Sequence, residues 1–389
     1  MTQNALFSEM SALSKLGMAD PTTSLPVEML TRIFRLLPPR SLKTAVLVCR
    51  RWREVGEGSG LWHWVTLALT TRNMDFFSEL LESPRFLTRR TVAIKLDSLQ
   101  KKDKPKISES LLQAILDHPS LTQLNVEDPL NTCVLKAGQL VRVMGRMEEV
   151  NIPDSVLSDE QFTAIFEAIS QESNLRKVNL GHSRVFIKLA SVPRPRTIRQ
   201  GLFAKAVSTL EELNISGIRL SFLQVEEIFT AITEHSNLKK LTLGLWSLNN
   251  NSPENHLNCL SDRLLSTAVA RLEHFEVYRM MLVKEKYEAI LTAITSEDSK
   301  LKTIKFGCKN MTKVDSELLA KAINKLEDVA LRRLTLKQFQ TILEHCSNDT
   351  RLKKIIVDFV EGRLRKKSDL YIRAEKCIGH LVVEDWEEE

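Results

Sequence analysis

LRKVNL, residues 175–180, is one copy of a six-residue pattern that occurs nine times and decides the fold. The pattern is L-x-x-L-x-L, with Val, Ile, Met or Phe replacing some leucines, and successive copies start 25 to 35 residues apart. Alternating apolar residues are typical of a half-buried strand, and a near-constant interval is typical of stacked repeats. The copies are LTQLNV from Leu121, MEEVNI from Met147, LRKVNL from Leu175, LEELNI from Leu210, LKKLTL from Leu238, LEHFEV from Leu272, LKTIKF from Leu301, LEDVAL from Leu326 and LKKIIV from Leu352.

Helical spacing fills the intervals between these motifs. Residues 162–169, 225–232 and 287–294 each carry apolar side chains at i, i+3, i+4 and i+7. Alternating strand and helix periods predict an α/β solenoid, with parallel strands on its concave face and helices on its convex face. This pattern resembles a leucine-rich-repeat solenoid over about residues 91–357. The rival is a doubly wound α/β fold, which would show fewer units and a Gly-rich phosphate turn that the sequence lacks.

A different kind of segment precedes the repeats: LPVEMLTRIFRLLPPRSLKTAVLVCRRWREVGEGSGLW at residues 25–62. Apolar residues within 30–37 follow helical spacing, and the Pro-Pro pair at 38–39 should stop that helix. A second helix is predicted from Ser41 to the glycines that begin at Gly56. Some 40 residues bury too little surface to be stable alone, so we expect this segment to need another chain.

This segment resembles an F-box. The matching residues are Leu25-Pro26, Glu28, Ile33-Phe34, Leu37-Pro38, Val48-Cys49, Arg51-Trp52 and Leu61-Trp62. The resemblance implies docking on the Skp-type adaptor of a cullin–RING ubiquitin ligase; an amphipathic helix pair packed on its own domain is the alternative. The residues expected at the adaptor interface, or in the packing around it, are Leu25, Pro26, Leu30, Ile33, Phe34, Leu37, Leu42, Val46, Val48, Trp52 and Trp62.

The residues between the leucine-type positions should face outward and form columns along the concave face. The column at the fifth motif position reads Asn125, Asn151, Asn179, Asn214, Thr242, Glu276, Lys305, Ala330 and Ile356. Aromatic and basic residues in the later repeats are typical interface anchors, which favours target binding there. The alternative is that the Trp packs into its own insertion and the Phe caps the last repeat. The predicted target-binding residues are Trp246, Tyr278, Lys305, Arg332 and Phe359.

Composition and motifs argue against several other classes of protein. Lys and Arg total 55 against 49 Asp and Glu, and this net charge of +6 is too dispersed for nucleic-acid binding. Six scattered cysteines without a CxxC pair indicate a reducing compartment, so we expect the cytosol or the nucleus. No apolar run reaches the roughly 18 residues of a membrane helix. The sequence carries no catalytic, metal-binding or phosphate-binding motif, and we expect no cofactor and no enzymatic activity.

We divide the chain into a tail at 1–24, an F-box at 25–65, a solenoid at 66–360 and a basic-then-acidic tail at 361–389. The last tail could cap the solenoid or cover its concave face. The resemblance implies a non-catalytic substrate-recognition subunit, which reaches cullin and RING subunits through the adaptor and holds a protein target close to the ubiquitin carrier. The alternative is a repeat scaffold or inhibitor that binds proteins without ubiquitin transfer.

Overall fold

The structure, a computed structural model, forms two compact units: Met1–Lys95 with Gln100–Leu124 (unit 1), and Leu96–Leu99 with Asn125–Glu389 (unit 2). The division between the units falls within strand β3 (Gln123–Glu127). The structure describes residues 25–37, 39–57, 67–69, 91–95, 113–114, 116–117, 121–127, 135–153, 157–171, 174–181, 201–218, 220–244, 256–278, 280, 282–307, 311–346, 350–359, 368–378 and 380–383.

In unit 1 the described elements are short. Helices α2 (Val27–Arg35), α3 (Pro39–Ala45) and α4 (Arg50–Glu57) precede the parallel strands β1 (Leu67–Leu69) and β2 (Thr91–Lys95). The first predicted helix ends before the Pro-Pro pair, as expected. The second proline opens α3, where the missing N–H of proline costs no hydrogen bond.

The second predicted helix is wrong, because the chain breaks it into α3 and α4. The N–H groups of Leu47 and Val48 donate to carbonyls three residues back, which closes α3 with a tight turn. The Cys49 Sγ then accepts a hydrogen bond from the Trp52 N–H at 3.4 Å and starts the next helix. The break leaves Leu47 and Val48 in a turn instead of on a helix face.

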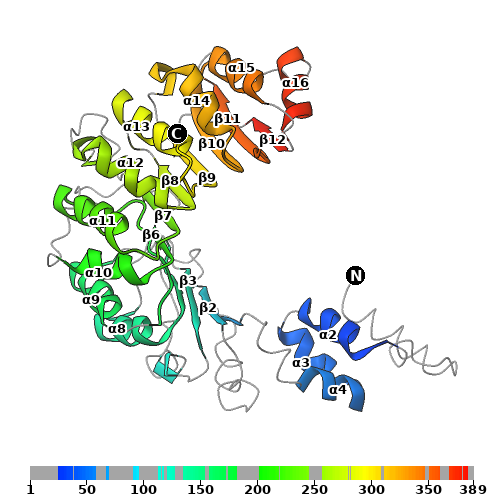
Figure 1. Cartoon of the computed structure of the whole chain (residues 1–389). Helices are drawn as coiled ribbons and strands as arrows, with labels where there is room; N and C mark the ends of the chain where they lie inside the picture. The colour runs from blue at the N-terminus through cyan, green and yellow to red at the C-terminus, as the bar shows by residue number, and fades with distance from the viewer. Residues whose placement is uncertain are drawn as a thin grey trace, which may run out of the picture. The chain divides into compact units, whose positions relative to one another are not determined.

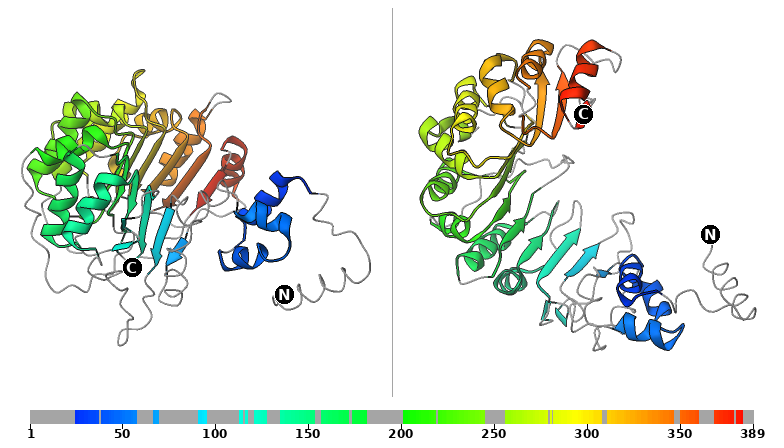
Figure 2. Two further views of the ribbon diagram at one scale, coloured as in Figure 1. Left: turned by 90° about the horizontal axis from the view of Figure 1, so that it is seen from below. Right: turned by 45° about the vertical axis from the view of Figure 1, so that its right-hand side comes forward.

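Unit 2 is built on a parallel sheet in which each strand pairs with the next one along the chain. Figures 1 and 2 show that the strands of unit 2 line the inner side of an arc and that its helices cover the outer side. The predicted α/β solenoid is confirmed. The strands are β4 (Glu149–Asn151), β5 (Lys177–Asn179), β6 (Glu212–Asn214), β7 (Lys240–Gly244), β8 (His274–Tyr278), β9 (Thr303–Gly307), β10 (Asp328–Leu334), β11 (Lys354–Phe359) and β12 (His380–Val383).

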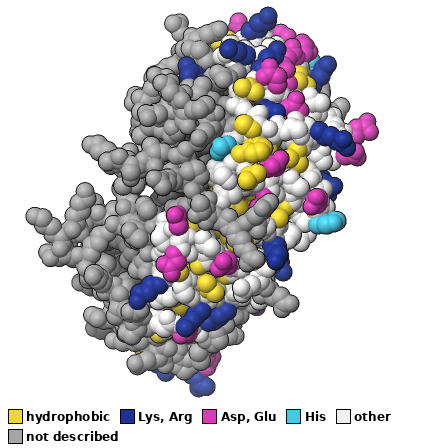
Figure 3. Space-filling model, turned by 90° about the vertical axis from the view of Figure 1, so that its left-hand side faces the viewer, with side chains coloured by type: hydrophobic (Ala, Val, Ile, Leu, Met, Phe, Trp, Pro, Cys, Tyr) yellow, Lys and Arg dark blue, Asp and Glu magenta, His cyan; other side chains and the backbone are white. Residues whose placement is uncertain are grey.

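The helices of unit 2 include all three predicted apolar stripes, which lie in α9, α11 and α13. Figure 3 shows the helix-covered side, where acidic and basic side chains are interspersed with apolar ones. Among the described helices, none is long and apolar enough to cross a bilayer. The helices are α8 (Ala137–Arg146), α9 (Asp159–Ser170), α10 (Leu202–Thr209), α11 (Phe222–Glu234), α12 (Asp262–Arg271), α13 (Lys284–Thr295), α14 (Ser316–Ile323), α15 (Leu336–His345) and α16 (Asp369–Cys377), with 3-10 helices η2 (His256–Cys259) and η3 (Met311–Lys313).

The leucine-type strand positions form the core between sheet and helices. Leu241 and Phe275, on neighbouring strands, are fully buried. Aromatic rings connect helices to strands: the Phe229 ring lies 6.3 Å from that of Phe275, and the Tyr287 ring lies 5.3 Å from that of Phe306. Full burial of one such side chain contributes about 1.5–3 kcal/mol, so the stacked units stabilise one another.

A glutamine at the third position of several helices links its helix to the preceding repeat of the solenoid. The Gln161 Oε1 accepts a hydrogen bond from the Ser158 N–H at 2.7 Å, and its Nε2 donates to the Leu135 carbonyl at 2.6 Å. One side chain thus caps its own helix and bonds the preceding loop. In α13, Lys286 occupies this position and its Nζ contacts the Leu260 carbonyl. We call these side chains the inter-repeat caps.

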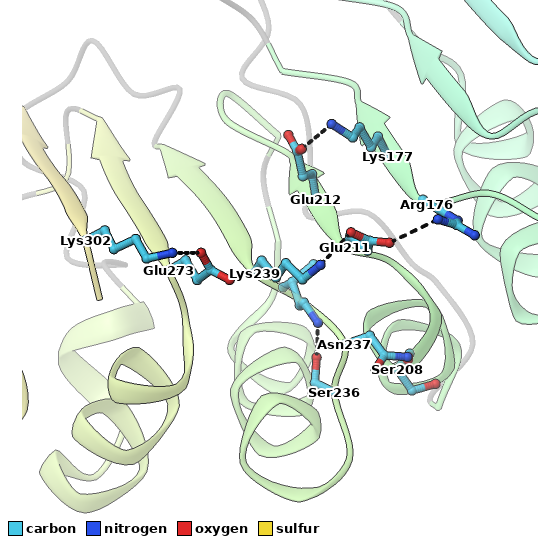
Figure 4. Close-up of polar contacts among 11 residues, drawn as sticks. Arg176, Lys177, Ser208, Glu211, Glu212, Ser236, Asn237, Lys239, Glu273 and Lys302 are labelled. Carbon is cyan, nitrogen blue, oxygen red and sulfur yellow. Dashed lines mark hydrogen bonds and ion pairs between the residues drawn. The ribbon is translucent and has the colours of Figure 1, made fainter. Parts of the chain in front are cut away.

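Charges of alternating sign occupy the second position of successive strand motifs (Figure 4). Glu211 pairs with Arg176 at 3.6 Å and with Lys239 at 2.8 Å, and Glu273 pairs with Lys302 at 2.5 Å. The hydrogen bond from Lys239, with the Lys239 charge, lowers the pKa of Glu211. We call these residues the charge ladder: Glu148, Arg176, Glu211, Lys239, Glu273, Lys302, Glu327 and Lys353.

The sheet continues beyond the predicted end of the solenoid at residue 360. Strand β12 pairs in parallel with β11, with Leu381 beside Ile355. On the preceding helix α16, Ala374 is buried, and so is Ile378 directly after that helix. The described part of the predicted tail therefore extends the solenoid to Val383.

Candidate functional site

Two apolar stripes run along α2 in unit 1. Leu30 and Phe34 are buried, at 1% and 0% exposure. Met29, Ile33 and Leu36 are 45%, 41% and 85% exposed, and their i, i+4, i+7 spacing places them on one outer face. Sequence reasoning missed Met29 and Leu36, although this spacing was visible in the sequence.

The interior of the three-helix module is filled by its own side chains. The Phe34 ring meets the Trp52 ring edge-on, with centroids 5.2 Å apart. Leu42 and Val46 are at most 2% exposed. A Cβ atom at Gly56 would lie 2.3 Å from the Val46 Cγ1, so glycine allows the close approach of α4 to residue 46. The fold of the module therefore leaves its outer apolar residues unused.

Further apolar side chains lie in the turn between α3 and α4. Leu47 is 69% exposed and Val48 is 39% exposed. Exposed apolar side chains concentrated on so small a module mark an interaction surface. With Val27, which is 51% exposed at the start of α2, these residues form what we call the exposed apolar set of unit 1: Val27, Met29, Ile33, Leu36, Leu47 and Val48.

On the concave face of unit 2, the observed register aligns the fifth motif positions as predicted from Asn151 on β4 to Ile356 on β11. The early asparagines bond within the solenoid. The Asn179 Nδ2 donates to the Asn151 Oδ1 at 2.6 Å, and the Asn214 Oδ1 accepts from the Ser216 N–H at 3.0 Å. These amide groups stabilise the strand ends and have less capacity left for a ligand.

The later half of the face carries a buried carboxylate. The Glu276 side chain is 8% exposed, and its Oε1 lies 2.9 Å from the Lys305 Nζ and 3.8 Å from the Lys240 Nζ. Its Oε2 accepts hydrogen bonds from the Tyr278 hydroxyl at 2.9 Å and the Thr242 hydroxyl at 3.5 Å. Both oxygens are thus bonded, and we call these five residues the Glu276 cluster.

The electrostatics of this cluster keep Glu276 ionised. Burial alone would raise the pKa of Glu276, but the hydrogen bond from Lys305 and the charges of Lys305 and Lys240 outweigh it, and the net shift is downward. Burial, followed by the charge of Glu276, raises the pKa of the Tyr278 hydroxyl, which stays a donor. The cluster is a fixed set of charges, not a proton-transfer pair.

The five predicted target-binding residues have different positions and exposures in the structure. Tyr278 and Lys305 belong to the cluster, Arg332 is part-exposed on β10, and Trp246 lies outside the described residues. The prediction for Phe359 is wrong, because Phe359 is only 9% exposed and packs edge-on against Phe339, 5.3 Å away. The alternation of β11 puts Phe359 on the core side.

The histidine at the end of α15 has a structural environment. The His345 Nε2 lies 3.0 Å from Glu317 on α14, and its Nδ1 lies 3.0 Å from the Thr341 carbonyl. Over the part of the chain that the structure describes, no group of three or more His, Cys, Asp or Glu side chains is placed to hold a metal ion.

Comparison with known proteins identifies the three-helix module. Residues 22–68 match the family described as F-box-like. Residues 22–68 are an F-box-like module, and the α/β solenoid of unit 2 follows it in the chain. No curated protein sequence matches it. Distantly similar solved structures include a chain of the yeast Rad7 and Elc1 complex, at 13% identity and a TM-score of 0.46 over 94% of this chain and 96% of that one. They also include a Bacteroides fragilis protein, at 11% identity and a TM-score of 0.36 over 84% of this chain and 76% of that one.

The predicted adaptor residues fall into two groups by their burial in the F-box-like module. Leu30, Phe34, Leu42 and Val46 are interior side chains, and Trp52 is part-buried against them. The part-exposed or exposed residues are Leu25, Pro26, Ile33, Leu37 and Val48, while Trp62 lies outside the described residues. A Phe34→Ala change would remove a core ring, at about 3–5 kcal/mol, and would test folding before it tested adaptor contact.

Proposed function

We propose that this protein is the substrate-recognition subunit of an SCF-type ubiquitin ligase. The F-box-like module docks on a Skp-type adaptor, which links the chain to cullin and RING subunits, and the concave face of the solenoid holds a protein target. The chain supplies no chemistry of its own: it raises the local concentration of target lysines near the charged ubiquitin carrier. Its place of action is the cytosol or the nucleus.

The observation that carries this proposal is the exposed apolar set of unit 1. The family match covers the helices and the turn that present these side chains, and the module fills its own core without them. A module of this size gains stability when a partner covers such residues. The adaptor is the partner that an F-box-like family match implies.

The test is co-expression of the full chain with a Skp-type adaptor, followed by gel filtration. We expect a one-to-one complex with the unchanged chain. A double change, Leu36→Asp with Leu47→Asp, should weaken the complex at least about 100-fold, because two apolar contacts become buried charges. Circular dichroism should stay unchanged, since both side chains are largely exposed in the free chain.

Leu223→Asp is the matched control. Leu223 lies on α11 in unit 2 and is 64% exposed, so its replacement makes the same chemical change away from the F-box-like module. This variant should co-elute with the adaptor as the unchanged chain does. Co-elution of the Leu36→Asp, Leu47→Asp chain at full strength would contradict the proposed adaptor surface.

A further inference from the structure

The charges of the Glu276 cluster do not balance. Two ammonium groups, from Lys240 on β7 and Lys305 on β9, converge on one oxygen of the Glu276 carboxylate. By formal charge the five residues of the cluster sum to about +1. The charge of Arg332 also acts on Tyr278, but Arg332 interacts with the Asp358 carboxylate, which offsets it. A buried anion between two cations fixes the positions of both lysine side chains.

The lysines keep donors for another anion. Their side chains are 37% and 31% exposed, and each ammonium group has three N–H donors. The four hydrogen-bonding and ionic contacts of Glu276 already occupy its two oxygens. The lysine donors that do not meet Glu276 therefore remain available to an acceptor that approaches the concave face.

Tyr278 supplies an apolar platform beside these donors. It is 37% exposed, and its hydroxyl bond to Glu276 holds the ring along its own strand. Its register neighbours on the adjacent strands are Gly244 and Gly307, which have no side chains to cover the ring. Rigid aromatic side chains next to cations are the usual anchors of protein interfaces.

We propose that the Glu276 cluster binds an Asp or Glu side chain of the protein target, with the adjoining target residue packed on the Tyr278 ring. This inference rests on the proposed function insofar as the target occupies the concave face. The charge decides between anions: a single carboxylate neutralises the net +1, whereas a phosphate dianion would overcompensate it and bring a second negative charge to the Glu276 carboxylate.

The test is selection of a random twelve-residue peptide library, displayed on phage, on the full chain. We expect enriched peptides to carry Asp or Glu beside an apolar residue. The enriched peptide should bind at least about tenfold more weakly to a variant with Lys240→Met, Lys305→Met and Glu276→Gln, which removes both cations and leaves no unpaired buried charge. A melting curve checks that this variant is folded.

Two further measurements sharpen the result. Glu276→Gln alone raises the net charge of the cluster to about +2 and should tighten peptide binding, since Gln can still accept the Tyr278 hydrogen bond. Lys284→Met with Lys321→Met, on helices α13 and α14, is the matched control and should leave binding unchanged. Replacement of the selected acidic residue by phosphoserine should weaken binding.

Several outcomes would overturn the inference: enrichment of basic or charge-neutral peptides, acidic peptides that bind the triple variant equally well, or tighter binding of the phosphoserine peptide. Adaptor co-elution is measured separately on the same variants. Loss of adaptor binding by the unchanged chain would refute the ligase proposal and leave an acidic peptide selection intact, so the two failures are distinguishable.

Discussion

At the residue scale, Glu276 is a carboxylate that its neighbours keep ionised despite burial. Its folded pKa is lower than its ordinary value of about 4.3, so its contribution is complete above that value and is lost as pH falls through the folded pKa. We predict that Glu276→Gln lowers stability by about 1.5–3 kcal/mol at pH 7, the range for hydrogen bonds to a charged group. Melting temperatures of both chains should converge as pH falls below about 4.

Glu297→Gln is the control for this prediction. Glu297 is exposed in the segment after α13, so its replacement by Gln removes the same charge at a position outside the Glu276 cluster. Its melting temperature should follow that of the unchanged chain at every pH. A difference between Glu276→Gln and the unchanged chain that stays constant down to pH 2 would contradict the linkage.

The same residue shows where sequence reasoning ends. The alternation of the β8 motif predicted that Glu276 faces outward, and it does lie on the concave face. Its burial could not be predicted, because it depends on lysines from the two neighbouring strands, 36 and 29 residues away in sequence. Phe359 is the opposite case: period two along β11 already placed it in phase with Ile355, and so in the core.

At the element scale, the inter-repeat caps predict that substitutions of two glutamines of α15 differ sharply in their effect on stability. Gln338 is 2% exposed; its Nε2 donates to the Met311 and Val314 carbonyls at 2.8 and 3.1 Å, and its Oε1 accepts from the Thr335 N–H at 3.1 Å. Gln338→Ala leaves these buried groups unpaired and should cost about 1–3 kcal/mol per unsatisfied group at most. Faster hydrogen exchange in η3 and the first turn of α15 would report it.

Gln340→Ala removes the same side chain two residues later. Gln340 is exposed and its amide donates to Glu344, at 2.8 Å, within the helix. This i, i+4 contact is worth about 0.2–0.5 kcal/mol, so the exchange rates around η3 should not change. Equal effects of the two substitutions would show that Gln338 does not join α15 to the preceding repeat.

The elements themselves were predictable to different degrees. α9, α11 and α13 follow from the 3.6-residue period, since each must bury one face on the sheet. The break between α3 and α4 does not, because the apolar positions from Leu42 to Trp52 also fit one continuous helix. A local contact, the hydrogen bond between the Cys49 sulfur and the Trp52 N–H, accompanies the break.

At the scale of the whole molecule, the leucines explain why the repeats stack, but they do not distinguish one repeat from another. All the strand motifs bury similar apolar side chains, so the core alone would tolerate several pairings. The charge ladder differs, because its sign alternates from one repeat to the next, and each ladder residue after Glu148 donates its N–H to the carbonyl of the ladder residue before it. It therefore favours the observed order and register, and it is visible in the sequence once the strands are aligned.

This view predicts a salt-dependent defect when one ladder sign is reversed. Lys302→Glu removes the pairing with Glu273 and places three carboxylates in succession, from Glu273 to Glu327, so the melting temperature should fall at low salt. Most of the loss should disappear near 1 M NaCl, where the Debye length is about 3 Å. Lys300→Glu makes the same charge change at an exposed position outside the ladder and should have little effect. If both variants lose the same stability at every salt concentration, net charge and not the alternation of signs governs the stacking of the units.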